Sequence, residues 1–185
     1  MIQINDKYFE IYLEKEEIQS KINALASLIN KDYEGKEVLF IAVLNGAFMF
    51  ASDLLKKINL KCEISFIKVS SYEGTASKGD VKELIGLQND IRNKSIILLE
   101  DIVDTGNTID AIFEILQKQN PESIKTCTLL YKSEAFKGVN KPTYYCFDIP
   151  NKFVVGYGLD YDEKGRNLEE IYQINEAFKP QNENN

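Results

Sequence analysis

Residues 96–108 have the sequence IILLEDIVDTGNT. The four aliphatic residues, after Ser95, predict a buried strand over 95–99, and the carboxylates of Glu100 and Asp101 follow its expected end. Asp104 then precedes Thr105-Gly106-Asn107-Thr108, which opens a predicted helix. Gly106 permits a tight turn, and the free N–H groups of a helix start favour a phosphate. A strand-end acidic pair suits sugar hydroxyls or a hydrated Mg²⁺.

A simpler interpretation of the same string has no ligand. Asp104 and Thr105 could cap the helix, while Glu100 and Asp101 could be solvated loop charges. That interpretation suits a single acidic dipeptide. The whole string of carboxylates, glycine and threonines favours a binding site.

The rest of the chain alternates strand-like and helix-like segments. Periodic apolar residues predict a helix over 14–31, and further apolar patterns indicate helices near 48–55 and 109–116. Apolar runs predict strands over 38–44, 62–69, 124–131, 144–149 and 153–157. This alternation predicts an α/β fold, a mostly parallel central sheet flanked by helices. Ligands of such sheets bind beyond the carboxyl ends of the strands.

The length of 185 residues predicts a single domain over 1–178, with a disordered tail over 179–185. Residues 70–90 interrupt the pattern, because they carry three glycines and few apolar side chains. Loops this long are usually lids or binding loops. The alternative is an exposed hairpin around 81–87 with no role in the site.

Composition excludes several classes of protein. The chain has no histidine, which rules out Ser-His and Cys-His nucleophile pairs, an HExxH zinc site and an imidazole base. A net charge of −7 argues against a nucleic-acid surface. The longest uncharged run, 38–52, is too short to span a membrane. Three widely spaced cysteines indicate reduced thiols, so we expect a cytoplasmic protein without nucleic-acid or membrane partners.

The string at 96–108 closely resembles the phosphoribosyl-diphosphate (PRPP) motif of type I phosphoribosyltransferases. Three further segments resemble the hypoxanthine(-guanine) branch of that family, in its order and spacing, over about 36–168. They are Val43-Leu44-Asn45-Gly46, Leu129-Leu130-Tyr131-Lys132, and Pro150-Asn151-Lys152-Phe153-Val154-Val155-Gly156-Tyr157-Gly158-Leu159-Asp160-Tyr161, with Arg166 beyond. The last of these is much the most specific.

The resemblance implies a PRPP site and a Mg²⁺ cofactor. Its PRPP- and phosphate-binding residues would be Asn45, Gly46, Glu100, Asp101, Asp104, Thr105, Gly106, Asn107, Thr108 and Arg166. Glu100 and Asp101 would hold the ribose hydroxyls directly or through Mg²⁺, and Asp160 would hold a second Mg²⁺ beside the diphosphate. Ser71 and Tyr72 match a lid motif that closes over the reaction, and the resemblance implies a small hood or lid region beside the central sheet.

The resemblance also implies a purine site. Its residues would be Lys132, Lys152, Phe153, Val154 and Asp160. Lys132 would donate to the 6-oxo group, Phe153 would stack on the ring, and the Val154 backbone would read the N1/C2 edge. Asp104 would be the catalytic carboxylate, accepting a proton at N7 as N9 attacks. A lone Phe153 would otherwise be a core residue, and a lone Lys132 a surface charge.

Two positions depart from the family's pattern. Asn45 stands where family members commonly carry a lysine in a turn that often contains a non-proline cis peptide, so a charge contact to pyrophosphate is missing there. Gly165 replaces a usual aromatic residue beside Arg166. Neither change removes a residue that the chemistry requires.

The implied activity is purine salvage by a hypoxanthine phosphoribosyltransferase: PRPP and hypoxanthine or guanine give IMP or GMP and pyrophosphate. A homodimer or homotetramer is expected. A relative that prefers xanthine stays possible. A receiver-type signalling domain has its acidic pair on the first strand, unlike this chain, and an RNA-binding regulator on the same fold would need a basic face.

Overall fold

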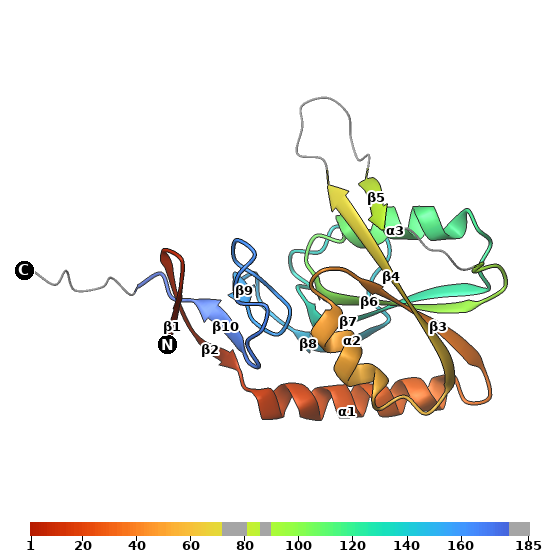
Figure 1. The fold of residues 1–185 in the computed structure, drawn as a ribbon, viewed down its shortest axis with the longest axis horizontal. Coiled ribbons are helices and arrows are strands. Elements are labelled where there is room, and N and C mark those ends of the chain that lie inside the picture. Colours follow the sequence, from red (N-terminus) through yellow and green to blue (C-terminus); the bar gives the residue numbers. More distant parts are fainter. Residues whose placement is uncertain (72–80, 86–89, 178–185) are drawn as a thin grey trace, which may run out of the picture.

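A computed structural model describes residues 1–71, 81–85 and 90–177 (Figure 1). In chain order the elements are β1 (Ile2–Ile4), β2 (Lys7–Leu13), α1 (Lys15–Asp32), β3 (Glu37–Val43), α2 (Phe48–Leu55), β4 (Lys61–Ser71), β5 (Val81–Ile85), β6 (Ser95–Val103), α3 (Asn107–Gln117), β7 (Ser123–Tyr131), β8 (Tyr144–Asp148), β9 (Val154–Val155) and β10 (Ile171–Ile174). None of the described helices is both long and apolar enough to cross a membrane.

The central sheet has the strand order β5-β4-β3-β6-β7-β8. Strands β4, β3, β6, β7 and β8 run parallel to one another. Strand β5 pairs antiparallel with β4 and is the edge strand. The helices α2 and α3 make crossovers between parallel strands, as this topology requires. The predicted α/β fold with a mostly parallel sheet flanked by helices is confirmed.

Strand β3 shows how the sheet builds a core on each face. Val38, Phe40 and Ala42 pack into the cluster that contains the buried residues of α1 and α2. The alternate residues, Leu39, Ile41 and Val43, pack with those of α3. Successive strand side chains point to opposite faces, so a strand covered on both sides needs a continuous apolar run. In Figure 1, α1 and α2 lie on one side of the sheet and α3 lies on the other.

Helix α1 follows its predicted range closely. The buried residues are Ile18, Ile22, Leu25, Ala26 and Ile29, whose spacing places them on one face of the helix. After the helix ends at Asp32, Gly35 takes a positive φ of 76° and leads the chain into β3. The apolar periodicity therefore predicts both the helix and its buried face correctly.

A second sheet, with the order β1-β2-β10-β9, was not predicted. The expected strand over 153–157 is reduced to Val154–Val155, and it pairs antiparallel with β10 instead of joining the parallel sheet. The strands β1, β2 and β10 were missed because their patterns are short or imperfect. In β2, for example, Ile11 is 49% exposed while Phe9 is fully buried.

The predicted lid region lies mostly outside the described residues. The backbone of β4 continues to Ser71, opposite Val81 of β5, so the described part forms an antiparallel pair, as in the alternative of a hairpin around 81–87. Tyr72 lies outside the described residues, as does the tail over 179–185. The role of this segment as a lid stays a prediction.

The turn after β9 depends on a glycine. Gly156 has a φ of 97°, and a Cβ added to it would lie 2.1 Å from the carbonyl oxygen of Glu170. Gly35 also has a positive φ, but a Cβ there would meet no atom within 4 Å. Both glycines therefore have a backbone conformation that disfavours a side chain, but only Gly35 has room for one.

We expect Gly156→Ala to lower the free energy of unfolding far more than Gly35→Ala. Gly35→Ala should cost about 1–2 kcal/mol, the penalty for a left-handed conformation. Gly156→Ala should cost more than about 3 kcal/mol, because the new Cβ overlaps backbone that must move. Urea unfolding of both variants measures the difference, and equal losses would contradict this packing argument.

Candidate active site

The predicted site residues gather at one edge of the central sheet. The neighbouring strands β3, β6, β7 and β8 run parallel, so their carboxyl ends lie at the same edge. The segments that leave this edge contain Asn45 and Gly46, Asp104 to Thr108, Lys132, and Asn151 to Phe153. Topology thus brings together side chains that are far apart in the sequence.

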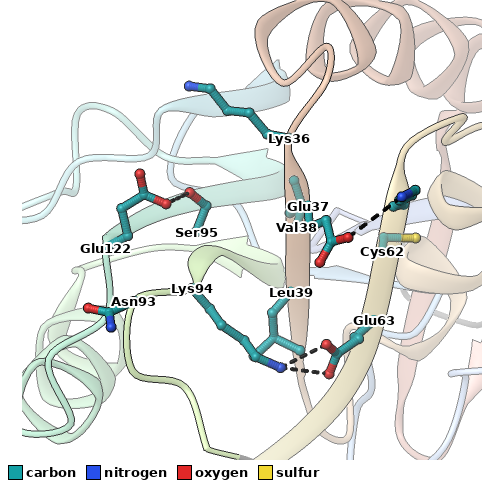
Figure 2. A pocket seen from close by; sticks show the side chains of 11 residues that line it. Lys36, Glu37, Val38, Leu39, Cys62, Glu63, Asn93, Lys94, Ser95 and Glu122 are labelled. Atoms are coloured by element: carbon teal, nitrogen blue, oxygen red, sulfur yellow. Dashed lines mark hydrogen bonds and ion pairs between the residues drawn. The ribbon is translucent and has the colours of Figure 1, made fainter.

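A cavity of about 520 Å³ lies at the opposite edge, near the amino ends of β3, β4 and β6 (Figure 2). Several of its charged and polar groups bind one another. Lys94 Nζ lies 2.7 Å from a Glu63 carboxylate oxygen, and Ser95 Oγ donates to Glu122 at 2.8 Å. None of the residues that line it is a predicted site residue. The chemistry predicted from the sequence therefore belongs to the carboxyl edge.

Strand β6 continues to Val103, past its predicted end at Leu99. Glu100 and Asp101 are therefore consecutive residues of the strand, instead of loop residues beyond it. Glu100 is 6% exposed, and burial raises its pKa well above the usual value, with a further contribution from Asp101. The interpretation of this pair as solvated loop charges is wrong.

Asp101 lies directly against the turn after β3. A Cβ added to Gly46 would lie 1.6 Å from Asp101 Oδ2, so only glycine leaves room for this carboxylate. The peptide bond between Leu44 and Asn45 is cis. Burial raises the pKa of Asp101 to about 6, although the Ile102 N–H, 2.8 Å from Asp101 Oδ1, favours the charged form.

Asp104 and Lys132 form an ion pair at the ends of β6 and β7. Lys132 Nζ lies 2.6 Å from Asp104 Oδ2 and donates to Asn151 Oδ1 at 3.3 Å. The side chain of Lys132 is 8% exposed and that of Asp104 is 42% exposed. Lys132 is therefore no surface charge, and its ammonium is held beside a carboxylate that solvent or a ligand can reach.

The helix start after β6 has exposed polar residues and a glycine. Gly106, with a φ of 91°, occupies the N-cap position of α3, and no side chain caps the helix. The alternative in which Asp104 and Thr105 are capping residues is therefore wrong. Thr105, Asn107 and Thr108 are exposed. Helix N–H groups and hydroxyls are thus available for an anion.

This turn is fixed from outside by residues that the sequence did not reveal. A Cβ on Gly106 would lie 2.5 Å from the Phe136 ring. Asp110 accepts hydrogen bonds from the N–H groups of Val139 and Asn140 at 2.8 and 2.9 Å. These bonds lower the pKa of Asp110 despite partial burial, which raises it. No motif around 136–140 indicated this support.

Asp160 and Arg166 lie beside Asp101. Arg166 Nη2 is 2.8 Å from Asp160 Oδ1, and Arg166 Nη1 donates to the Gly158 carbonyl at 2.8 Å. Both residues influence the pKa of Asp101, which Arg166 lowers and Asp160 raises. A Cβ on Gly158 would lie 2.0 Å from the Gly46 carbonyl oxygen, so the two loops touch through their backbones. The replacement at Gly165 leaves Arg166 in this group.

The predicted purine-binding residues have different exposures. Phe153 is 46% exposed and packs edge-on against Tyr161, with ring centroids 5.8 Å apart, so it is not a core residue. Val154 is buried in β9. Lys152 donates to Gln173 Oε1 at 2.8 Å, which holds it against the second sheet. Lys152 and Phe153 also line a cavity of about 420 Å³.

Among the described residues, no three acidic, cysteine or histidine side chains form a cluster that could hold a metal unaided. Glu100, Asp101 and Asp160 nevertheless supply the hard oxygen donors that Mg²⁺ prefers. Mg²⁺ commonly binds proteins through one or two carboxylates, with substrate phosphates and water completing its shell. The donor set therefore fits a metal that arrives with a phosphate ligand.

The raised pKa of Asp101 predicts a stability gain for Asp101→Asn. Folding raises this pKa from 3.8 to about 6, so stability is lost as pH rises through about 6. The variant should be more stable than the parent at about pH 8, by on the order of 1–3 kcal/mol, and nearly equal at about pH 4. Chemical unfolding at both pH values measures this.

Asp90→Asn serves as the control, because Arg92 lowers the pKa of Asp90 to about 2. Its stability contribution has the opposite sign and is lost as pH falls through about 2. This variant should gain nothing at pH 8. If both variants gained the same stability at pH 8, the gain of Asp101→Asn could not be attributed to the burial of the Asp101 carboxylate.

Comparison with known proteins agrees with this geometry. Residues 9–162 match the phosphoribosyl transferase domain family. A hypoxanthine-guanine phosphoribosyltransferase of Streptococcus thermophilus is 40% identical over 171 residues, which cover 88% of this chain and 95% of that protein. One of Staphylococcus aureus is 42% identical over 160 residues, covering 86% and 89%.

Solved structures are similar over the same range. The crystal structure of a hypoxanthine phosphoribosyltransferase from Staphylococcus aureus has a TM-score of 0.86 and 41% identity, covering 92% of this chain and 93% of that one. One of a hypoxanthine-guanine phosphoribosyltransferase from Bacillus anthracis has a TM-score of 0.85 and 39% identity, covering 91% and 98%. The chain therefore belongs to the phosphoribosyltransferase family, among the hypoxanthine-guanine phosphoribosyltransferases.

Proposed function

We propose that this protein transfers the phosphoribosyl group of PRPP to N9 of hypoxanthine or guanine, giving IMP or GMP and pyrophosphate in purine salvage. The observation that carries the proposal is the ion pair between Lys132 and Asp104. In a 6-oxopurine, the oxygen on C6 and the nitrogen N7 lie on the same edge of the ring. A buried ammonium and a carboxylate 2.6 Å apart match these two neighbouring atoms.

The 5′-phosphate would bind at the start of α3. Thr105, Asn107 and Thr108 are exposed there, and Gly106 supplies the positive φ with which the turn enters the helix. The N–H groups of the helix start carry partial positive charge and satisfy an anion well. Phe136 would preserve the shape of this turn through its contact with Gly106, while Asp110 would hold the backbone of the adjoining segment at Val139 and Asn140.

The ribose and the diphosphate would lie over Asp101, Glu100 and Asp160. Mg²⁺, when bound, would neutralise the charge that develops on the departing diphosphate. Arg166 would add a cationic hydrogen-bond donor, held in place by its contacts with Asp160 and the Gly158 carbonyl. The raised pKa values of Glu100 and Asp101 suit carboxylates whose charged forms a bound cation would stabilise.

The purine would lie against the exposed ring of Phe153, which Tyr161 holds edge-on. The Val154 backbone would bind the N1/C2 edge of the purine. Lys152, which donates to Gln173, would hold the loop that carries Phe153 in place. As N9 forms its bond to C1′, the N7 proton becomes more acidic, and Asp104 would accept it or strengthen its hydrogen bond. The cytoplasmic homodimer or homotetramer stays a prediction.

A steady-state assay with PRPP, Mg²⁺ and hypoxanthine, guanine, xanthine or adenine tests the proposal. Hypoxanthine should be converted, and excess chelator should abolish turnover, because the carboxylates would otherwise repel the diphosphate. Adenine should react roughly tenfold to a hundredfold less efficiently, since its amino group opposes the Lys132 ammonium. Equal rates with adenine, or full activity in chelator, would disprove this function.

Asp104→Asn tests the catalytic carboxylate. Asparagine keeps the size of the side chain but cannot accept a proton, so kcat should fall by roughly 10²–10⁴. Thermal unfolding should confirm that the variant is folded, and the KM for PRPP should change little. Asp90→Asn is the control, because it also removes one carboxylate from an ion pair, with Arg92, away from the site. A kcat near that of the parent would rule out the role of Asp104.

A further inference from the structure

Lys68 reaches the candidate site from β4, a strand that contributed no predicted site residue beyond the lid motif. Its Nζ donates to Asn45 Oδ1 at 3.2 Å. The two residues are close because β3 and β4 are paired in parallel, with Val43 opposite Ile67. The N–H of Leu44 also donates to the Ile67 carbonyl at 2.8 Å. Lys68 is therefore tied to the turn that follows β3.

Charged groups of opposite sign, from two other strands, contact neighbouring residues of this turn. Lys68 contacts the side chain of Asn45, while the Asp101 carboxylate lies against the backbone of Gly46. Gly158, whose carbonyl binds Arg166, touches the same turn. The turn is therefore on the side of the site that holds Asp101, Asp160 and Arg166. The helix start proposed for the 5′-phosphate follows another strand, β6.

The ammonium of Lys68 differs in its partner from the cationic groups of Lys132 and Arg166. Lys132 is paired with Asp104, and Arg166 is paired with Asp160. Among the described residues, no ion pair includes Lys68, and its hydrogen-bond partner is a neutral amide. A neutral acceptor orients an ammonium without cancelling its charge, so the charge can still attract an anion.

We propose that Lys68 supplies the positive charge that Asn45 lacks at this turn, and that it binds the diphosphate of PRPP and the pyrophosphate product. This inference rests on the proposed function. Asn45 Oδ1 would orient the lysine, the turn N–H groups would bind phosphate oxygens, and the ammonium would add a charge-assisted hydrogen bond. A lysine side chain is long enough to shift from Asn45 to a phosphate oxygen without movement of its strand.

The test compares Lys68→Met with Lys61→Met. Lys61 lies at the other end of the same strand, with an exposed side chain 3.9 Å from Glu37. Lys68→Met should raise the KM for PRPP and the dissociation constant of Mg²⁺-pyrophosphate by roughly tenfold to a hundredfold, as expected for a hydrogen bond to a charged group. The KM for hypoxanthine should stay within about threefold. Lys61→Met should resemble the parent in every measurement.

Moving the charge gives the more stringent comparison. In the double variant Asn45→Lys, Lys68→Met, the turn itself carries the lysine, and pyrophosphate affinity should recover to within about fivefold of the parent. Lys68→Arg, which keeps the charge, should lose less than about tenfold and covers the case in which methionine disturbs folding. Calorimetric binding of Mg²⁺-pyrophosphate reports on each variant without turnover.

The outcomes separate the two proposals. A parent protein with no PRPP-dependent activity would overturn the proposed function. A parent that is active, with Lys68→Met and Lys61→Met binding pyrophosphate equally well, would overturn the role of Lys68 alone. Equal loss in Lys68→Met and Lys68→Arg, without recovery in the double variant, would also overturn it, because the effect would not follow the charge.

Discussion

The burial of β6 on both faces is the constraint on which the rest of the structure depends. This strand pairs with β3 on one side and β7 on the other, and its aliphatic residues pack into the hydrophobic core on each face of the sheet. A strand so placed cannot shift without breaking two ladders and two packed layers. The carboxylates of Glu100 and Asp101 are consequently held at fixed positions, even though burial disfavours their charged forms.

Charged groups held at least partly away from water are the common feature of this site. Asp101 is in contact with Gly46 and near Arg166, and Asp104 is close to a buried ammonium. Groups arranged in this way gain from a ligand that brings opposite charge or hydrogen bonds, because the cost of desolvation has already been met during folding. The folded protein is thus less stable than its core alone would allow, as expected at a functional site.

Local patterns in the sequence predicted the elements whose apolar residues follow a regular period. Helix α1 and strand β3 are examples, since each has a single uninterrupted pattern and a covered face. The second sheet escaped prediction because β9 has two residues and β1 has three, which is too short for a period to show. Strand β6 exceeded its predicted length because backbone pairing with β7 continues through Ile102 and Val103, beyond the polar residues taken as its end.

Most residues of the candidate site were named from motifs, but their contacts were not. Nothing local to Lys132 indicates that it meets Asp104, because the contact depends on β6 and β7 being neighbours. Asn151 and Lys68 were missed for the same reason. Asn151 touches Lys132, and Lys68 touches Asn45, through positions set by the sheet. Motifs identify chemistry, whereas strand order decides which groups can act together.

The contact between Gly158 and the carbonyl of Gly46 has a consequence for protein engineering. Two loops that follow different sheets meet there backbone to backbone, with no side chain between them to absorb a change in shape. If the loop that contains Gly46 were replaced by that of a relative, it would fit only if the loop that contains Gly158 were replaced as well. For the purposes of design, these two loops form a single interchangeable part.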